Sequence, residues 1–276
     1  MTTDLDQVHR ARLPELRVAA TPWRIRGLIG RTVVVDSRSA VLVWEPRRVT
    51  PVYAVPLADV IGEVARGGGG SAGAEFDSRP VLDPTVPFDV HTTAGVAFQI
   101  RAAEGVVDAF APDDPLMAGR LLIDFDALDW MEEGDPVVAH PRDPYHRIDT
   151  HSTARHLVLS IDGVIVVDTV QATMLAETSL PVRWYVPRKD VLVPLETSGT
   201  VTWCAYKGRA TYSSAVVGGA VVPDIAWTYS EPQRDAADVQ GLLGFYAERM
   251  DATVDGEPLK RRAMTPPAED APRSTR

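Results

Sequence analysis

The sequence has little cysteine and no long apolar stretch, and each shortage excludes a class of protein. Cys204 is the single cysteine among 276 residues, so the chain can form neither an internal disulfide nor a Cys-x-x-Cys zinc site. No apolar run approaches the roughly 20 residues of a membrane-spanning helix. The first residues also lack the apolar segment of a signal peptide. We therefore expect a cytoplasmic protein with no membrane partner.

Positive charge is also scarce. The chain has 28 Lys and Arg residues against 38 Asp and Glu, which gives a formal net charge of −10. Nucleic-acid binding needs a concentrated positive field, so we expect no nucleic-acid partner. Charged residues make up 24% and hydrophobic residues 45% of the chain, as in ordinary globular proteins, and the length suits two modest domains or one large one.

Two parts of the chain resemble each other in the same order. Arg31–Ser37 resembles Gly163–Thr169, Val41–Glu45 resembles Thr173–Glu177, Val55–Val60 resembles Val186–Val191, Val107–Pro115 resembles Asp224–Pro232, and Leu122–Phe125 resembles Leu242–Phe245. These ordered matches predict two diverged copies of one unit, residues 21–138 and 139–258. We expect a flexible N-terminal arm at 1–20 and a disordered, proline-containing tail at 259–276.

The copies read mainly as strands. Thr32–Val35 and Val164–Val167 are β-branched runs bounded by turn residues, and Val182–Val186 is a further strand candidate. We also expect a short helix in each copy, beginning after Asp114 and Asp235. Their apolar sides would be Leu121, Leu122 and Phe125 in the first copy, and Val239, Leu242, Leu243 and Tyr246 in the second. The predicted fold is mostly β, with two homologous small antiparallel domains, barrel- or sandwich-like, each with about one short helix.

Reactive side chains concentrate in Thr200–Tyr212. Alternation places Thr202 and Cys204 on one face of a strand and Trp203 on the other. Continued, it would put Tyr206 beside Cys204 and Lys207 across the sheet, unless a bulge at Gly208 re-aims Lys207. Lys207 could bind a carboxylate or phosphate as a point charge, or lie exposed in a turn. Cys204 could be a nucleophile or a small packed side chain, and Tyr206 a hydrogen-bond donor or a core ring.

The segment that joins the two copies is stiffened by Pro141 and Pro144 and carries several polar side chains. Those predicted to bind a ligand are His140, Arg142, Asp143 and Tyr145. Arg142 and Asp143 could instead pair and lock the copies together. Histidine recurs at 140, 146, 151 and 156, but no zinc-binding spacing is present, so we expect no metal site.

A glycine run, Gly67–Gly70, precedes Ser71 in the first copy. Glycine loops can cradle phosphate where a strand precedes them and a helix with Lys and Ser or Thr follows. The residues after Ser71 lack that pattern. We therefore interpret the run as a flexible hairpin insertion.

The second copy and its lead-in resemble an uncharacterised family, number 427 among the domains of unknown function, which is also labelled a nucleotidyltransferase domain. The resemblance rests on five motifs in family order: His140–Arg147, Leu180–Val191, Cys204–Gly208, Asp224–Tyr229 and Phe245–Arg249. The family usually has proline at the position of Ala205. The first copy has His91–Arg101 in place of the Cys204–Gly208 motif. The label implies nucleotidyl transfer, and only the second copy could carry a whole site.

Three functions follow as alternatives. The first is the binding of a small anionic ligand in or beside the second copy, with Arg188 as a further contact. The second is an enzyme that uses Cys204 as nucleophile or Lys207 to stabilise an oxyanion. The third is a structural or interaction protein whose polar motifs only stabilise the fold. The motifs identify no cofactor.

Overall fold

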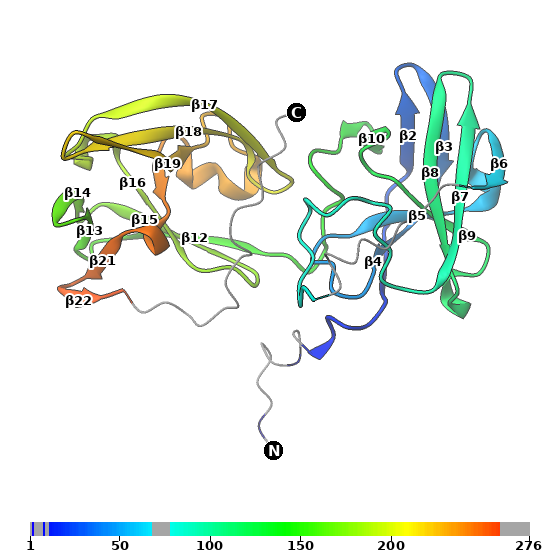
Figure 1. Ribbon diagram of the computed structural model, residues 1–276, viewed down its shortest axis with the longest axis horizontal. Helices are drawn as coiled ribbons and strands as arrows, with labels where there is room; N and C mark the ends of the chain where they lie inside the picture. The colour runs from blue at the N-terminus through cyan, green and yellow to red at the C-terminus, as the bar shows by residue number, and fades with distance from the viewer. Residues whose placement is uncertain (1, 3–7, 9–10, 68–77, 260–276) are drawn as a thin grey trace. The chain divides into compact units, whose positions relative to one another are not determined.

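The computed structural model describes residues 11–67 and 78–259, together with Thr2 and Val8. It consists mainly of antiparallel β-strands, as the sequence predicted (Figure 1). The chain divides into two compact units, unit 1 at Met1–Asp143 and unit 2 at Pro144–Arg276. The division falls within the proline-stiffened segment. Each unit is described by itself below.

Unit 1 contains two antiparallel sheets. The larger sheet has the order β1 (Arg17–Ala20), β4 (Val41–Trp44), β5 (Val52–Pro56), β9 (Arg120–Ile123), β8 (Gly105–Pro112), β7 (Gly95–Ala102) and β6 (Glu63–Arg66). The smaller sheet has the order β11 (Asp135–Pro136), β10 (Asp129–Glu132), β2 (Ile25–Ile29) and β3 (Thr32–Ser37). Two short 3-10 helices, η1 (Leu57–Asp59) and η3 (Pro115–Met117), lie in the connections.

Unit 2 repeats this arrangement of strands. Its larger sheet has the order β12 (Ile148–Thr153), β15 (Ala172–Glu177), β16 (Arg183–Val186), β20 (Leu243–Phe245), β19 (Ala220–Thr228), β18 (Gly208–Val217) and β17 (Leu195–Cys204). The smaller sheet has the order β14 (Val164–Thr169), β13 (Leu157–Ile161), β21 (Asp251–Val254) and β22 (Glu257–Pro258). The 3-10 helices are η4 (Arg188–Asp190), η5 (Arg234–Val239) and η6 (Ala247–Arg249).

The main core of each unit lies between its two sheets. In unit 1, Val34 and Trp130 of the smaller sheet share one apolar cluster with Leu42 and Val55 of the larger sheet. In unit 2, Leu157 and Val166 share a cluster with Trp184 and others in the same way. Successive strand residues point to opposite faces, so the larger sheet also has an outer face, which points away from the smaller sheet. The outer face carries a second, smaller cluster in each unit.

Each unit has an equivalent hydrogen-bonded corner, at the end of β3 in unit 1 and at the end of β14 in unit 2. The hydroxyl of Ser37 donates to Asp59 at 2.6 Å, and the hydroxyl of Thr169 donates to Asp190 at 2.6 Å. Each hydroxyl also accepts a hydrogen bond from the backbone N–H two residues later. The acidic residue belongs to η1 in unit 1 and to η4 in unit 2, so each bond ties a short helix to the end of a strand.

The predicted helices are shorter than expected. Asp114 caps η3 by accepting a hydrogen bond from the N–H of Leu116, but the helix ends at Met117, and Leu121 and Leu122 belong to β9. Helix η5 ends at Val239, and Leu243 belongs to β20. In both units the chain turns out of the helix and enters a central strand of the larger sheet.

Two further expectations concern the ends of the copies. Strand β1 lies within residues 1–20, where we expected a loose arm, and it pairs with β4. Most of the glycine-rich run and of the tail, residues 68–77 and 260–276, lies outside the described residues.

Candidate functional site

The outer face of the larger sheet in unit 2 is lined by aromatic side chains that carry polar groups. Tyr185, Tyr212, Trp227 and Tyr229 are each 6% exposed or less and share one cluster with η5. The indole N–H of Trp227 donates to the hydroxyl of Tyr185 at 3.1 Å. Gly244 lies between these rings in the sheet, and a Cβ there would stand 2.7 Å from the indole. Only glycine leaves room for this pair of rings.

Glu177 ends strand β15 at the margin of this face. Its side chain is 6% exposed, and its Oε1 lies 3.0 Å from Nε2 of His146. Its Oε2 forms an ion pair with the ammonium of Lys207, whose side chain is 11% exposed. A carboxylate, an ammonium and an imidazole therefore meet at a position with little exposure to solvent. We call Glu177, His146 and Lys207 the Glu177 cluster.

Lys207 reaches Glu177 because it lies in the turn of the β17–β18 hairpin. Cys204 pairs with Gly208, so Ala205, Tyr206 and Lys207 form the turn and do not continue the strand. Gly208 has φ of +88°, a conformation that favours glycine. The predicted alternation beyond Cys204 is therefore wrong. Lys207 is directed at Glu177 by this tight turn and not by the suggested bulge at Gly208.

His146 is held on two sides. Its ring stacks on that of Tyr206, with ring centroids 4.0 Å apart and 20° between the planes. Because a carboxylate only accepts hydrogen bonds, the contact with Glu177 places a hydrogen on Nε2. The stack and the hydrogen bond together fix the position of the imidazole.

The electrostatics of the cluster favour an ionised Glu177. Burial alone would raise the pKa of this carboxyl, but the hydrogen bond from His146 and the charge and hydrogen bond of Lys207 together outweigh burial and lower it. Burial raises the pKa values of Tyr185 and Tyr229, with smaller contributions from the charge of Glu177. These two phenols are therefore neutral hydrogen-bonding groups beside a charged carboxylate.

Cys204 lies on the same face as the tyrosines, as the alternation predicted. It is partly exposed, and its thiol is near enough to Tyr185 and Tyr229 to contribute to their raised pKa values, after burial. Its strand neighbour Thr202 contacts the hydroxyl of Tyr212 at 3.0 Å. Cys204 thus lines the aromatic face.

The other predicted contacts belong to several elements. Arg188 is exposed in η4, which follows β16, whereas Glu177 lies near the start of that strand. Tyr145 precedes His146 and is 72% exposed. The remaining three, His140, Arg142 and Asp143, belong to unit 1. There, the charge of Arg142 acts on Glu132 and that of Asp143 on Arg17.

Two members of the cluster were not predicted as site residues. His146 was noted in the proline-stiffened segment as one of four histidines that lack zinc-binding spacing, and it was not predicted to bind a ligand. Glu177 was noted only as the acid that ends an apolar run and matches Glu45 between the two similar parts of the sequence. An acid at the end of the same strand in both units was the available signal, because strand ends are positions where a carboxylate can be buried and still meet loop side chains.

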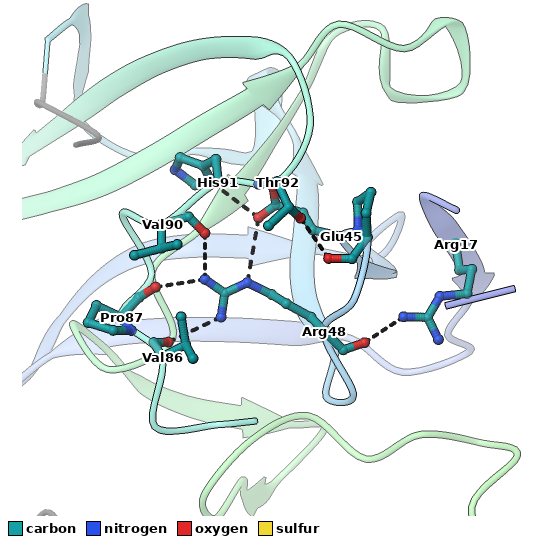
Figure 2. A network of polar contacts seen from close by, with 9 residues as sticks. Arg17, Glu45, Arg48, Val86, Pro87, Val90, His91 and Thr92 are labelled. Carbon is teal, nitrogen blue, oxygen red and sulfur yellow. Dashed lines mark hydrogen bonds and ion pairs between the residues drawn. The ribbon is translucent and has the colours of Figure 1, made fainter. Parts of the chain in front are cut away.

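Unit 1 has a different network at the corresponding sheet position. Glu45 is 2% exposed and accepts hydrogen bonds from the backbone N–H of Thr92 and, at Nδ1, from His91, both at 3.1 Å. Arg48 lies 3.9 Å from Glu45 and donates to the carbonyls of Val86, Pro87 and Val90 (Figure 2). Glu45 and Arg48 therefore fasten the segment between β6 and β7 onto the sheet.

Two features are absent from the described parts of the chain. These parts contain no group of three or more His, Cys, Asp or Glu side chains placed to hold a metal ion. None of their helices has the length and apolar character needed to cross a membrane.

Part of unit 2 is similar to a known protein family. Residues 149–256 match the model of a family described as a domain of unknown function (DUF427), labelled NTP_transf_9. Glu177, Cys204 and Lys207 lie inside the matched region, and His146 lies just before it. No curated protein matches the chain.

Proposed function

We propose that unit 2 binds a small anionic ligand, whose acidic group contacts Lys207 and His146 at the margin of the aromatic face. We further propose that unit 1 is a diverged copy of the same domain in which the corresponding position serves only the fold. The observation that carries the first proposal is the burial of three ionisable side chains in one cluster.

Burial of such a cluster is costly. Charged groups that leave water lose several kcal/mol each in solvation, and a buried ion pair commonly stabilises a fold less than apolar residues of the same volume would. Structural networks also bury charge, but strongly perturbed ionisable groups gather at functional sites. The pair of Lys207 and Glu177 is therefore better explained by binding than by stability alone.

The donors of the cluster suit an anion. An ammonium has three N–H donors, and the hydrogen bond from Lys207 to Glu177 uses one of them. The low exposure of Lys207 makes its charge act through protein more than through water, which strengthens its attraction for a carboxylate or phosphate. The net charge of −10 supports a small ligand over nucleic acid.

The test is to titrate the full-length protein with acetate and with inorganic phosphate, and to measure binding by calorimetry and by amide NMR shifts. We expect binding by the wild type and a loss of at least about tenfold in affinity for Lys207→Met. Lys189→Met removes an exposed lysine of the same unit and is the matched control. Equal affinity in the wild type and Lys207→Met would contradict the proposal.

Lys207→Met leaves Glu177 buried without its cation and could unfold the unit. The double variant Glu177→Gln, Lys207→Met removes both charges together and avoids this problem. It should fold, as judged by circular dichroism, and should not bind either anion. Binding by the folded double variant would place the anion elsewhere.

A second candidate function is favoured by the position of Cys204. Its partly exposed thiol lies on the aromatic face, where Lys207 could stabilise a developing oxyanion in an acyl- or nucleotidyl-transfer reaction. The rate of iodoacetamide labelling against pH tests this candidate. Rapid labelling below about pH 7 would indicate a thiolate and support catalysis. Labelling only after unfolding would exclude Cys204 as the nucleophile and leave the binding proposal standing.

A further inference from the structure

The charges of the Glu177 cluster balance only in one protonation state of His146. Glu177 and Lys207 cancel each other. The Nε2 of His146 is committed to Glu177, so its charge depends on Nδ1. Within the described parts of the chain, Nδ1 has no hydrogen-bond partner. A neutral imidazole presents a lone pair at Nδ1, whereas a protonated one presents an N–H donor.

We infer that each anion bound at the Glu177 cluster is accompanied by one proton taken up at Nδ1 of His146. This inference rests on the proposed ligand site. With neutral His146, an incoming anion would add an uncompensated negative charge beside buried Glu177 and would face the Nδ1 lone pair. With protonated His146, the same anion restores neutrality and accepts a hydrogen bond from Nδ1. The site therefore selects an anion together with a proton.

His146 is packed against ionisable groups from two other segments. Glu177 faces it from β15, and Lys207 and Tyr206 face it from the hairpin turn. On its own segment, Arg147 and Asp149 are paired with each other at the surface. Lysine and tyrosine change charge far above neutral pH and carboxylates well below it, whereas an imidazole changes charge between about pH 5 and 8.

The lowered pKa of Glu177 agrees with this assignment, because a carboxyl that stays ionised cannot supply the proton. Tyr185, whose pKa is raised by burial, stays neutral over the same range. The proton must therefore come from solvent.

The experiment measures the affinity of the full-length protein for acetate between about pH 6 and 8.5, a range in which acetate itself stays ionised. One coupled proton predicts a loss of about tenfold in affinity for each pH unit at the alkaline end of this range. His146→Gln keeps an N–H donor for Glu177 but cannot gain a proton. Its affinity should be low and independent of pH. His151→Gln, an exposed histidine of β12, should keep the wild-type slope.

The outcomes separate this inference from the proposed site. Acetate binding with no pH dependence, or the same slope in His146→Gln, would overturn proton coupling and leave the site standing. Absence of binding at every pH would overturn both. A second variant gives an independent check: folded Glu177→Gln removes the negative charge, so Lys207 alone should hold acetate. Its affinity at about pH 8 should then exceed that of the wild type. An unchanged or lower affinity would contradict the charge argument.

Discussion

The outer faces of the two larger sheets occupy the same strand positions but have opposite chemistry. Unit 1 places Ala54, Phe110 and Leu122 on adjacent strands, where they form an apolar cluster with Met117. The sheet register of unit 2 places Tyr185, Trp227 and Gly244 at these positions. The first face is filled by apolar side chains, on which the ring of His91 stacks at Phe110, whereas the second is filled by rings that hydrogen bond to each other.

The buried glutamate of each unit follows the same division. Glu45 accepts hydrogen bonds from a backbone N–H and from a histidine of one loop. The guanidinium of Arg48 donates its hydrogen bonds to backbone carbonyls of that loop (Figure 2). Glu177 instead forms hydrogen bonds with the side chains of His146 and Lys207, which come from two separate segments. One strand position thus supports a structural clasp in unit 1 and a cluster of side chains with spare donors in unit 2. The comparison indicates that the loops decide what a shared strand position does.

The largest test of this comparison is Arg48→Met. We expect unit 1 to lose about 3–5 kcal/mol of stability, because Glu45 loses its nearby cation and three backbone carbonyls lose their donor. Hydrogen exchange read by mass spectrometry should show faster exchange in the segment 82–92. Arg31→Met, at an exposed turn of the same unit, is the control. A small loss would mean that Arg48 is not the fastener of the loop.

A smaller effect is expected from Gly244→Ala. The added Cβ would lie 2.7 Å from the ring of Trp227 and 3.0 Å from that of Tyr185, so the rings must shift, at a cost of about 1–3 kcal/mol. Chemical denaturation and the near-ultraviolet circular dichroism of the aromatic face would measure it. Gly199→Ala meets no atom within 4 Å and serves as the control in the same unit. Equal behaviour of the two variants would show that the face adapts freely, as an apolar face could.

The sequence predicted the shared frame better than it predicted the differences. Strands such as β3 and β14 were visible because β-branched residues between turns are a local signal. The helices were predicted too long, because Leu121, Leu122 and Phe125 have a spacing that fits a helix face. In the structure Gly119, with φ of +74°, ends the turn after η3 and the leucines enter a strand. Short apolar runs of this kind do not distinguish the two outcomes.

The candidate site was predicted in part for the same reason. Cys204 and Thr202 share a face because alternation is local. Lys207 was identified, but its partner Glu177 lies 30 residues away and meets it only through the pairing of distant strands. His146 joins them from a third segment. Contacts between segments depend on register and loop path, which composition and periodicity do not encode.

The contributions of Glu132 in unit 1 and Glu177 in unit 2 to the pH dependence of stability should have opposite signs. Burial raises the pKa of Glu132 in unit 1, against the hydrogen bond from Tyr53 and the charge of Arg142. The native state therefore holds this proton more tightly than the unfolded state. Its stabilisation is present below the unfolded carboxyl pKa, about 4.3, and is lost as pH rises through the folded value.

Glu177 behaves in the opposite way, because its folded pKa is lowered. Its contribution is present above about pH 4.3 and is lost as pH falls through the folded value. Hydrogen exchange of peptides from each unit, compared between about pH 4 and 6 after correction for intrinsic rates, would measure both trends. Glu132→Gln and Glu177→Gln should each flatten the trend of their own unit only. An unchanged trend in either variant would contradict the assignment of that glutamate.

The smallest expected effects test what the units share. Ser37→Ala removes the hydroxyl that joins β3 to Asp59, and Thr169→Val removes the hydroxyl that joins β14 to Asp190. Both hydroxyls are buried and make the same two hydrogen bonds, so each variant should lose a similar amount, about 1–2 kcal/mol, in its own unit. Exchange of peptides from each unit would again be the measurement. Clearly unequal losses would mean that the corner is equivalent in geometry but not in energy, and the frame common to the two units would then extend only to the order of their strands.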